Sequence, residues 1–345
     1  MYTIRMHSKA DMAKGHGVLS AYEEQVSLVK KYLGKVFKVK ETGVCDIHHF
    51  HTINPEYLFV AWSNKLYGRK NVGYVHFLPE TLENSIQLPR GIQKLFYKYV
   101  LFFYKQMDEL VTVNPYFVDI LENKYHISRE RVTYIPNVVS TKKFYQMTLI
   151  EKDEARQHFQ LPNDKFIVLC AGQLQRRKGI FDFVETAKRM PDVQFVWAGD
   201  FSFGKISQDY EYIKKILSDP PENVTFLGFV EREDMNLLYN ACDLFFLPSY
   251  EVLFPMTILE AMACKIPIVV RELELYKDIL FDYVQYAESI NGFEESIQKA
   301  NTDRKFYKYC SMCSELGSYR YGEEVVAQQW KSFYLQLVTR HIKRS

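Results

Sequence analysis

The sequence lacks any run of 18 or more apolar residues, so no segment is predicted to cross a bilayer as a helix. The first residues, MYTIRMHSKADMAKGHG, also lack the basic-then-apolar pattern of a secretory leader and are typical of a strand followed by a loop. We therefore expect a protein that resides in the cytoplasm.

Metal-binding patterns are scarce as well. Of six scattered cysteines only Cys310 and Cys313 form a CxxC, and no second pair accompanies them, so we expect structural thiols. His48, His49 and His51 stand close together, but strand alternation sends His48 to the opposite face, so no metal site is predicted. No acidic pair in the sequence demands a divalent ion.

The length of 345 residues exceeds what one hydrophobic core usually fills, so two domains are expected. Residues 1–150 contain 20 Lys and Arg against 13 Asp and Glu, whereas 151–345 contain 24 against 29. A basic first half could bind nucleic acid, anionic lipid or a phosphorylated ligand. No nucleic-acid reader motif is present, so we expect no nucleic-acid partner.

Strand-length apolar runs alternate with helix-length amphipathic segments along the whole chain. The expected strands are YTIRMH, KVFKVK, DIHHFHT, VGYVHF, ELVTVN and TYIPNVV, then FIVLCAG, VQFVWAG, VTFLGFV, DLFFLPS and PIVV after a polar stretch. This alternation predicts an α/β fold with two Rossmann-like parallel sheets. We expect domains over 1–145 and 146–322, and a C-terminal helix over 323–345 that packs back toward the first.

Three turns between a strand and a helix matter most, because ligands bind beyond the carboxyl ends of parallel strands. The first, KGHG, contains Gly15 and Gly17. These glycines could let the backbone contact a phosphate or a sugar, or they could simply form a tight turn. The second, GQLQRRKG, places three consecutive cations at a helix start, which is unfavourable unless an anion binds there. The alternative is a solvated basic loop.

The third turn lies within PSYEVLFPMTILEAMACKIPIVV. Pro255 suits a first helical turn, which leaves the amides around Met256 and Thr257 free. Glu260 lies in an apolar run where an unpaired carboxylate would be costly to bury, and it could accept hydrogen bonds from two ribose hydroxyls.

In this order, the turns resemble those of the retaining glycosyltransferases with the GT-B fold, family four, over nearly the whole chain. GQLQRRKG resembles the family's G-R-L-x-x-x-K-G, and the third turn resembles its E-x-F-G-x-x-x-x-E-A segment. YIPNVV, VTFLGFVEREDMNLLYNACDLFFLPS and the final helix with Trp330 add support. The resemblance implies a sugar-nucleotide donor bound in a cleft between the two domains.

The resemblance also implies residue roles. Lys178 would neutralise the diphosphate, Glu260 would hold the ribose and Gly17 would lie against the donor. The remaining contacts would be the Phe229–Val230 backbone to the base, the Met256 and Thr257 amides to phosphate or sugar oxygens, and His76 to the transferred sugar. The alternative is a structural role, which is the more frequent one for a lone histidine.

Two positions depart from the family pattern. Gln173 replaces the family's arginine, so Arg176 or Arg177 would supply the missing cation. The family's first glutamate falls on Val252, and neighbouring Glu251 would replace it after a one-residue shift of the loop. If Glu251 does not, sugar recognition differs from the family or activity is compromised.

The mechanism that the resemblance implies is front-face attack, in which the departing phosphate oxygen takes the proton of the acceptor hydroxyl. The protein then supplies position and electrostatic stabilisation. Lys178, Arg177 and the helix N-terminus fit that task, so we expect no metal ion and no cofactor beyond the donor.

The acceptor is indicated by the segment LPRGIQKLFYKYVLFFYKQM, which sets lysines among aromatic and aliphatic residues. Such a helix suits an anionic membrane surface, or alternatively a cleft with a solvated lysine edge. The N-terminal segment and GQLQRRKG resemble bacterial glycolipid synthases that add a second hexose to monoglucosyl-diacylglycerol. We therefore expect a peripheral enzyme on the cytoplasmic face of the membrane, using UDP-glucose or UDP-galactose.

Three other functions are considered. One is a transferase for a soluble or polysaccharide acceptor. Another is a sugar-nucleotide epimerase, which should have acid and base carboxylates in a different motif context. The third is a non-catalytic partner that binds nucleotide-sugar or lipid, which Val252 at the expected glutamate position favours.

Overall fold

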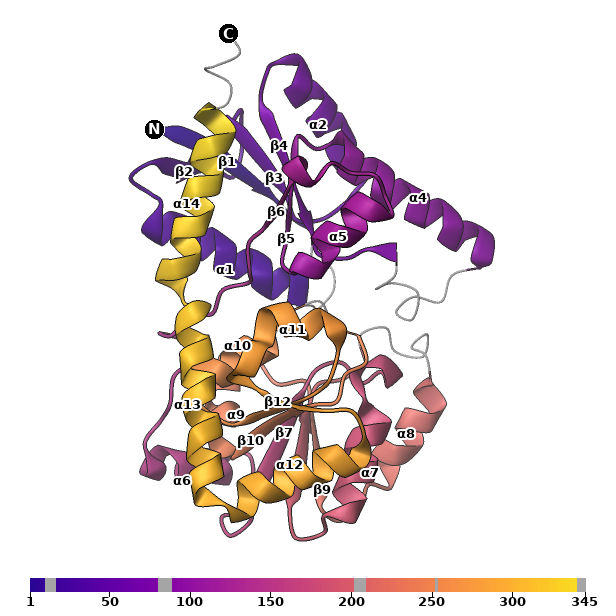
Figure 1. The fold of residues 1–345 in the computed structure, drawn as a ribbon, viewed down its shortest axis with the longest axis vertical. Helices are drawn as coiled ribbons and strands as arrows, with labels where there is room; N and C mark the ends of the chain where they lie inside the picture. The colour runs from indigo at the N-terminus through magenta and orange to yellow at the C-terminus, as the bar shows by residue number, and fades with distance from the viewer. Residues whose placement is uncertain (10–16, 80–88, 202–208, 252–253, 340–345) are drawn as a thin grey trace. The chain divides into compact units, whose positions relative to one another are not determined.

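A computed structural model describes the chain except for residues 10–16, 80–88, 202–208, 252–253 and 340–345. The chain divides into two compact units, one of residues 1–138 with 321–345 and one of residues 139–320 (Figure 1). The division expected from the sequence has its boundaries at 145/146 and 322/323.

The first unit contains a six-stranded parallel sheet with the order β2-β1-β3-β4-β5-β6. Its strands are β1 (Tyr2–His7), β2 (Phe37–Val39), β3 (Ile47–Phe50), β4 (Lys70–Val75), β5 (Glu109–Thr112) and β6 (Val132–Tyr134). Its helices are α1 (Gly17–Tyr32), α2 (Glu56–Leu66), α4 (Arg90–Gln106), α5 (Pro115–Asn123), the short η2 (Arg129–Arg131) and α14 (Glu323–Thr339). In Figure 1, α1 and α14 lie on one side of this sheet and α2, α4 and α5 on the other.

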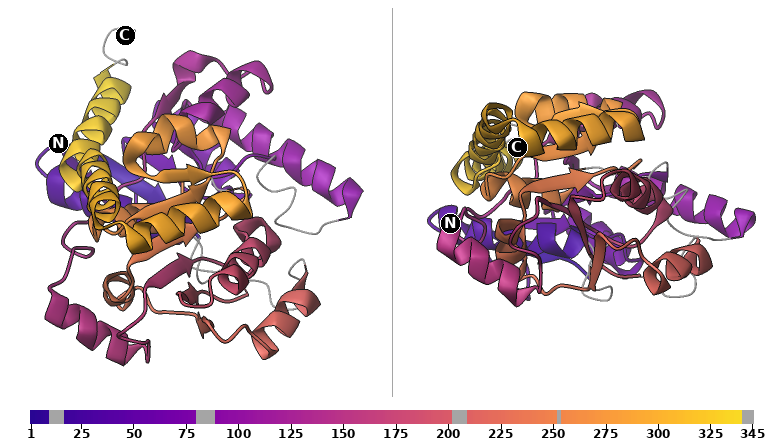
Figure 2. Two further views of the ribbon diagram at one scale, coloured as in Figure 1. Left: turned by 60° about the horizontal axis from the view of Figure 1, so that its bottom comes forward. Right: turned by 90° about the horizontal axis from the view of Figure 1, so that it is seen from below.

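The second unit contains another six-stranded parallel sheet, with the order β12-β11-β10-β7-β8-β9. Its strands are β7 (Ile167–Ala171), β8 (Gln194–Ala198), β9 (Val224–Gly228), β10 (Leu244–Leu247), β11 (Ile268–Arg271) and β12 (Gln285–Ala287). Its α-helices are α6 (Leu149–His158), α7 (Ile180–Arg189), α8 (Tyr210–Ser218), α9 (Met235–Ala241), α10 (Met256–Ala263), α11 (Glu274–Leu280), α12 (Ile290–Thr302) and α13 (Arg304–Arg320). Two short 3₁₀ turns, η3 (Arg176–Lys178) and η5 (Phe281–Tyr283), complete the unit, which Figure 2 shows in two further views.

The predicted fold class, two Rossmann-like α/β units, is confirmed. Every residue of β7, β8, β10 and β11 is buried, as expected for parallel strands covered by helices on both faces. The edge strand β12, with the sequence QYA, has too short and too polar a pattern for the sequence to predict it.

The C-terminal helix α14 packs within the first unit. Its Tyr334 hydroxyl lies 2.9 Å from both Gln25 Nε2 of α1 and His49 Nδ1 of β3. Lys31 forms an ion pair with Glu323 at 2.7 Å, and the buried Trp330 packs against Tyr74. Ring packing and buried hydrogen bonds thus tie the end of the chain to its beginning.

Candidate active site

Two loops at the carboxyl edge of the second sheet are joined by hydrogen bonds. Tyr250 N donates to the Arg177 carbonyl at 2.8 Å, and Ser249 Oγ donates to the same oxygen at 3.0 Å. Gly179 has φ +81°, and a Cβ placed on it would overlap Pro248. The cationic loop after β7 and the loop after β10 are therefore held in one arrangement that requires glycine at this position.

Glycines also join the turns after β7, β8 and β9. Trp197 Nε1 donates to the Gly172 carbonyl at 2.9 Å, and Gly199 N donates to the Gly228 carbonyl at 2.7 Å. A Cβ on Gly199 would overlap the backbone of Gly172. The absence of side chains at these turns lets three loops approach closely at the edge where a ligand is expected.

The three consecutive cations of η3 have different surroundings. Arg176 is exposed and pairs with Asp209 at 2.6 Å. Arg177 is half-buried, its Nη1 lies 3.5 Å from the Glu251 carbonyl oxygen, and burial lowers the pKa of its guanidinium, an effect that Glu251 opposes. Of the two cations offered as replacements for the family's arginine, Arg177 contacts the Glu251 backbone, whereas Arg176 pairs with Asp209.

Lys178 stands apart from its neighbours. Burial, reinforced by the positive charge of Arg177, lowers the pKa of the Lys178 ammonium to about 7. Within the described part of the chain, no carboxylate pairs with it. A desolvated ammonium of this kind is stabilised by a bound anion, which is the chemistry expected of a diphosphate contact.

Gln173 and Glu251 occupy the two positions where the sequence departs from the family. Both are half-buried, and Gln173 has a buried Oε1 that accepts no hydrogen bond from any described residue. Glu251 follows Tyr250 directly, whereas Val252 lies outside the described residues. The structure thus places the Glu251 backbone beside Arg177.

Glu260 is buried on α10 with both carboxylate oxygens engaged. Arg232 Nη1 donates to Oε1 at 2.8 Å, and the Tyr239 hydroxyl donates to Oε2 at 2.9 Å. Burial and the adjacent carboxylate raise the pKa of Tyr239, so its hydroxyl stays protonated. The sequence indicated that the Glu260 carboxylate would need a partner if it were buried, and the structure provides two. Neither Arg232 nor Tyr239 was predicted from the sequence.

The Arg232 ion pair has a consequence for the neighbouring loop. Arg232 lies two residues beyond Val230, in the segment after β9 where Phe229 is 48% exposed. The ion pair therefore links the carboxylate expected at the ribose to the backbone expected at the base.

The start of α10 supplies backbone donors. Met256 is the first residue of this helix and is buried, Thr257 is half-buried, and Pro255 precedes them in extended conformation without a side-chain cap. The first amides of a helix have no intrahelical acceptor, so they are available to an anion or to sugar oxygens.

A network of side chains that the sequence did not reveal supports the loop after β10. Arg271, at the end of β11, forms an ion pair with Asp182 and donates from Nε to the Pro248 carbonyl at 3.1 Å. Its guanidinium lies 3.9 Å from the Tyr250 ring, and the Tyr250 hydroxyl donates to Asp182 at 2.6 Å. The only feature of the sequence that could have indicated this network is the charged Arg271 at the end of the apolar strand IVVR.

The remaining predicted residues lie in the first unit. Gly17 begins α1, and Gly15 falls outside the described residues. His76 directly follows β4, is 8% exposed, and stacks on Tyr74 with ring centroids 4.1 Å apart. Its Nε2 lies 3.4 Å from His51 Nδ1, and burial lowers its pKa to about 3, so His76 is neutral at physiological pH.

The other histidines point in opposite directions from β3. His48 Nδ1 lies 3.0 Å from His7 Nε2, whereas His49 and His51 face Tyr74 on the other side of the sheet. In the residues with described positions, no cluster of three His, Cys, Asp or Glu could hold a metal ion. All six cysteines are buried free thiols.

Two Rossmann-like units, with a glycine-rich cationic loop at the carboxyl edge of the second, define the class of GT-B glycosyltransferases. Residues 151–315 match the family described as glycosyl transferases group 1, and residues 24–143 match Glycosyltransferase Family 4. The chain belongs to the glycosyltransferases of family four, as the sequence resemblance predicts.

Several relatives are glycolipid enzymes. The chain is 41% identical over 333 residues to the alpha-galactosylglucosyldiacylglycerol synthase of Streptococcus pneumoniae, covering 96% of this chain and 88% of the relative. It is 28% identical over 286 residues to the processive diacylglycerol alpha-glucosyltransferase of Acholeplasma laidlawii, covering 80% and 85%.

Solved structures share the fold at low identity. Anabaena HepE in complex with UDP and glucose has a TM-score of 0.77 at 16% identity, covering 97% of this chain and 99% of that one. Sucrose-phosphate synthase from Thermosynechococcus elongatus has a TM-score of 0.79 at 16% identity, covering 99% and 100%.

Proposed function

We propose that this protein is a retaining glycosyltransferase that transfers glucose or galactose from a UDP-sugar to monoglucosyl-diacylglycerol, producing a dihexosyl-diacylglycerol. The observation that carries the proposal is the 41% identity, along 96% of the chain, to an enzyme named for a galactosylglucosyldiacylglycerol product. Two further relatives are named as diacylglycerol or monoglucosyldiacylglycerol enzymes.

The donor is proposed to bind at the carboxyl edge of the second sheet. Lys178 and Arg177 would meet the diphosphate, assisted by the amide group of Gln173 and the first amides of α10 at Met256 and Thr257. Glu260 would accept the ribose hydroxyls with the lone pairs that Arg232 and Tyr239 leave open, and the Phe229–Val230 backbone would meet the base. A fold neighbour was solved with UDP-glucose, which supports a donor of this chemistry.

Catalysis would depend on electrostatic stabilisation of the leaving diphosphate. As the glycosidic bond to the phosphate oxygen breaks, negative charge grows on that oxygen, and the acceptor hydroxyl transfers its proton to it. Lys178 and Arg177 are largely removed from water, so their attraction for the developing charge is stronger than in solvent. We expect these two cations to provide the neutralisation that a divalent ion provides at other phosphate sites.

Two residues are proposed to recognise the transferred sugar. Glu251 would accept its hydroxyls in place of the family glutamate displaced by Val252. His76, neutral because burial lowers its pKa, could donate or accept one hydrogen bond to a sugar hydroxyl without adding charge.

The acceptor side is proposed to contact an anionic membrane at its cytoplasmic face. No helix among the described residues is long and apolar enough to span a bilayer. On α4, Ile92, Leu95 and Phe102 are 57%, 69% and 46% exposed, whereas Phe103 and Tyr104 are buried in the unit. The exposed Lys94, Lys98 and Lys105 accompany the apolar side chains, and α4 contains no acidic residue. This arrangement favours the membrane interpretation over a fully buried helix.

Helix α2 extends the same surface. Phe59, Trp62 and Leu66 recur at helical spacing and are 69%, 41% and 84% exposed. Trp62 Nε1 donates to Gln106 of α4 at 3.2 Å, which connects the two helices. Together they offer apolar side chains to a bilayer interface beside lysines for its phosphates.

The test is transfer from radiolabelled UDP-glucose and UDP-galactose, separately, to vesicles that contain monoglucosyl-diacylglycerol, with products separated by thin-layer chromatography. A slower-migrating glycolipid, formed together with UDP, would support the proposal and identify the donor. No product with either donor would overturn the lipid assignment. Transfer to soluble glycans, and UDP-sugar binding without turnover, would then separate the other transferase from a non-catalytic partner.

A further inference from the structure

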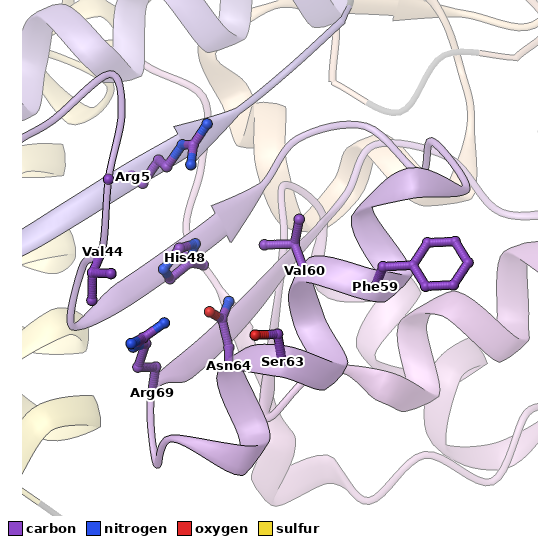
Figure 3. Close-up of a pocket in the computed structure, with 9 residues that line it drawn as sticks. Arg5, Val44, His48, Phe59, Val60, Ser63, Asn64 and Arg69 are labelled. Carbon is purple, nitrogen blue, oxygen red and sulfur yellow. The ribbon is translucent and has the colours of Figure 1, made fainter.

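A second cationic hollow lies in the first unit, apart from the loops described above. Its volume is about 430 Å³, and it lies between the first sheet and one side of α2 (Figure 3). Arg5 of β1, His48 of β3, Asn64 of α2 and Arg69 just before β4 line it, together with Ser63 and Val60. Val44 and Arg69 precede β3 and β4, so the hollow opens toward the amino ends of these strands, whereas His51 and His76 follow their carboxyl ends.

The charges of Arg5 and Arg69 are not balanced by any residue that lines the hollow. Among the described residues, neither the Arg5 nor the Arg69 guanidinium forms an ion pair or a hydrogen bond, and none of the residues that line the hollow is acidic. The Arg69 guanidinium lies 4.8 Å from the centre of the Tyr67 ring. Asp46, just before β3, does not line the hollow, and its Oδ2 accepts hydrogen bonds from the Thr3 amide and hydroxyl, both at 2.7 Å.

A partly desolvated guanidinium without a counter-ion is unfavourable, and arginine is almost never fully buried unless it is paired. His48, which lies between Arg5 and Arg69 in Figure 3, does not supply a negative charge. Burial, followed by the charges of Arg5 and Arg69, lowers its pKa to about 4 against a smaller opposing effect of the Cys45 carbonyl, so the ring is neutral at physiological pH. The hollow therefore has two positive charges and no acidic residue among those that line it.

We propose that this hollow binds a phosphate group through Arg5 and Arg69, with Ser63 and Asn64 as neutral hydrogen-bonding neighbours. The planar guanidinium presents paired donors that match phosphate oxygens, which makes arginine well suited to this ligand. Val44, 61% exposed at the edge of the hollow, could contact an apolar part of the same molecule. The site goes beyond the proposed reaction, because neither Arg5 nor Arg69 is assigned to donor or acceptor.

The phosphate could belong to a soluble phosphomonoester or to the headgroup of an anionic phospholipid. Two probes distinguish these sources: sn-glycerol 3-phosphate, titrated calorimetrically with UDP at saturation, and phosphatidylcholine vesicles with or without phosphatidylglycerol, in a sedimentation assay. Saturating UDP keeps the first probe away from the donor loops. The variant is Arg5→Gln/Arg69→Gln, and the control Lys30→Gln/Lys35→Gln removes two exposed charges of the same unit, on α1 and in the turn after it.

We expect the arginine variant to bind one probe at least about tenfold more weakly, as expected for the loss of two charge-assisted contacts, while the lysine variant does not. If the arginine variant binds glycerol phosphate more weakly, the ligand is a soluble phosphomonoester. If it loses only the phosphatidylglycerol-dependent vesicle binding, the ligand is a lipid headgroup. Equal behaviour of the two double variants with both probes would overturn the proposal. An unchanged UDP affinity and circular dichroism spectrum confirm folding, and Arg69→Gln alone provides the same test with one charge removed.

Discussion

Gly179 and Pro248 approach so closely that a Cβ added to Gly179 would overlap the Pro248 carbonyl oxygen. Gly179 also has φ +81°, a left-handed conformation that side chains other than glycine rarely adopt. The contact joins the loop that carries Lys178 to the loop that carries Glu251, so glycine at this position determines how the candidate site is assembled.

We expect Gly179→Ala to lower the free energy of unfolding by about 2 kcal/mol or more, because strain and overlap add. Urea unfolding and calorimetric UDP titration would measure the effect on stability and on the site. Gly91→Ala is the control, since an added Cβ in α4 meets nothing within 4 Å and should be neutral or slightly stabilising. Equal effects of both changes would show that the packing of these loops is not decisive.

Lys178 predicts a pH dependence of UDP binding. Its pKa of about 7 in the free protein is depressed by burial, and a bound diphosphate would raise it. The complex then holds more protons than the free protein, so affinity should fall as pH rises from about 7 to 9. The terminal phosphate of UDP is already ionised in this range, because phosphate monoesters have a pKa near ~6.

The measurement is UDP titration at pH 8 in buffers of different ionisation enthalpy, which reports the protons taken up on binding. We expect proton uptake in the wild type and none in Lys178→Met. Lys178→Arg should keep the positive charge, but its UDP affinity should no longer depend on pH between pH 7 and 9. The free energy of unfolding of the unliganded protein should instead increase as the pH rises over the same range. The reason is that the unfolded state holds the Lys178 proton that the folded protein loses. A pH-independent affinity in the wild type would argue against a diphosphate contact.

The alternation of apolar runs was sufficient to predict both sheets, because parallel strands covered on both faces have continuous buried runs such as FIVLC and DLFFL. It did not predict β12, whose three residues are held at the sheet edge by pairing with β11 rather than by their own pattern.

In the candidate site, too, local features could be predicted and distant contacts could not. The glycines and the lysine of GQLQRRKG indicated a phosphate-binding loop, because a single turn needs these residue types to bind phosphate. The partners of Glu260 and Arg271 could not be found in this way. Arg232, Tyr239 and Asp182 are 21 to 89 positions distant along the chain, and only the fold brings them into contact.

Glu260→Gln tests ribose recognition. The amide keeps the shape but removes the charge that Arg232 and the proposed hydroxyls share, so UDP affinity should fall roughly 10- to 100-fold. The variant should also lose much of the discrimination between UDP and 2′,3′-dideoxy-UDP, which a purely structural role would leave intact. Tyr239→Phe is the control, because it removes the other partner of Glu260 while keeping the carboxylate.

Glu251→Gln tests whether this residue replaces the family glutamate. If it holds a sugar hydroxyl in the transition state, kcat should fall roughly 10- to 100-fold while UDP affinity changes little. Glu272→Gln, an exposed glutamate just after β11, is the matched control. Unchanged turnover in Glu251→Gln would show that another group recognises the sugar.

The α2 and α4 surface predicts how the protein binds vesicles. Ile92→Ser/Leu95→Ser and Phe59→Ser/Leu66→Ser should each weaken binding to phosphatidylglycerol vesicles roughly tenfold or more, because exposed apolar side chains no longer enter the interface. Lys94→Gln/Lys98→Gln should reduce binding mainly at low salt, at about 1 kcal/mol per lysine. The control Leu149→Ser/Ile150→Ser removes two apolar side chains that are 81% and 74% exposed on the acidic helix α6. If this control weakens vesicle binding as much as the α4 pair does, exposed apolar area alone accounts for binding, and the assignment of the membrane surface to α2 and α4 is wrong.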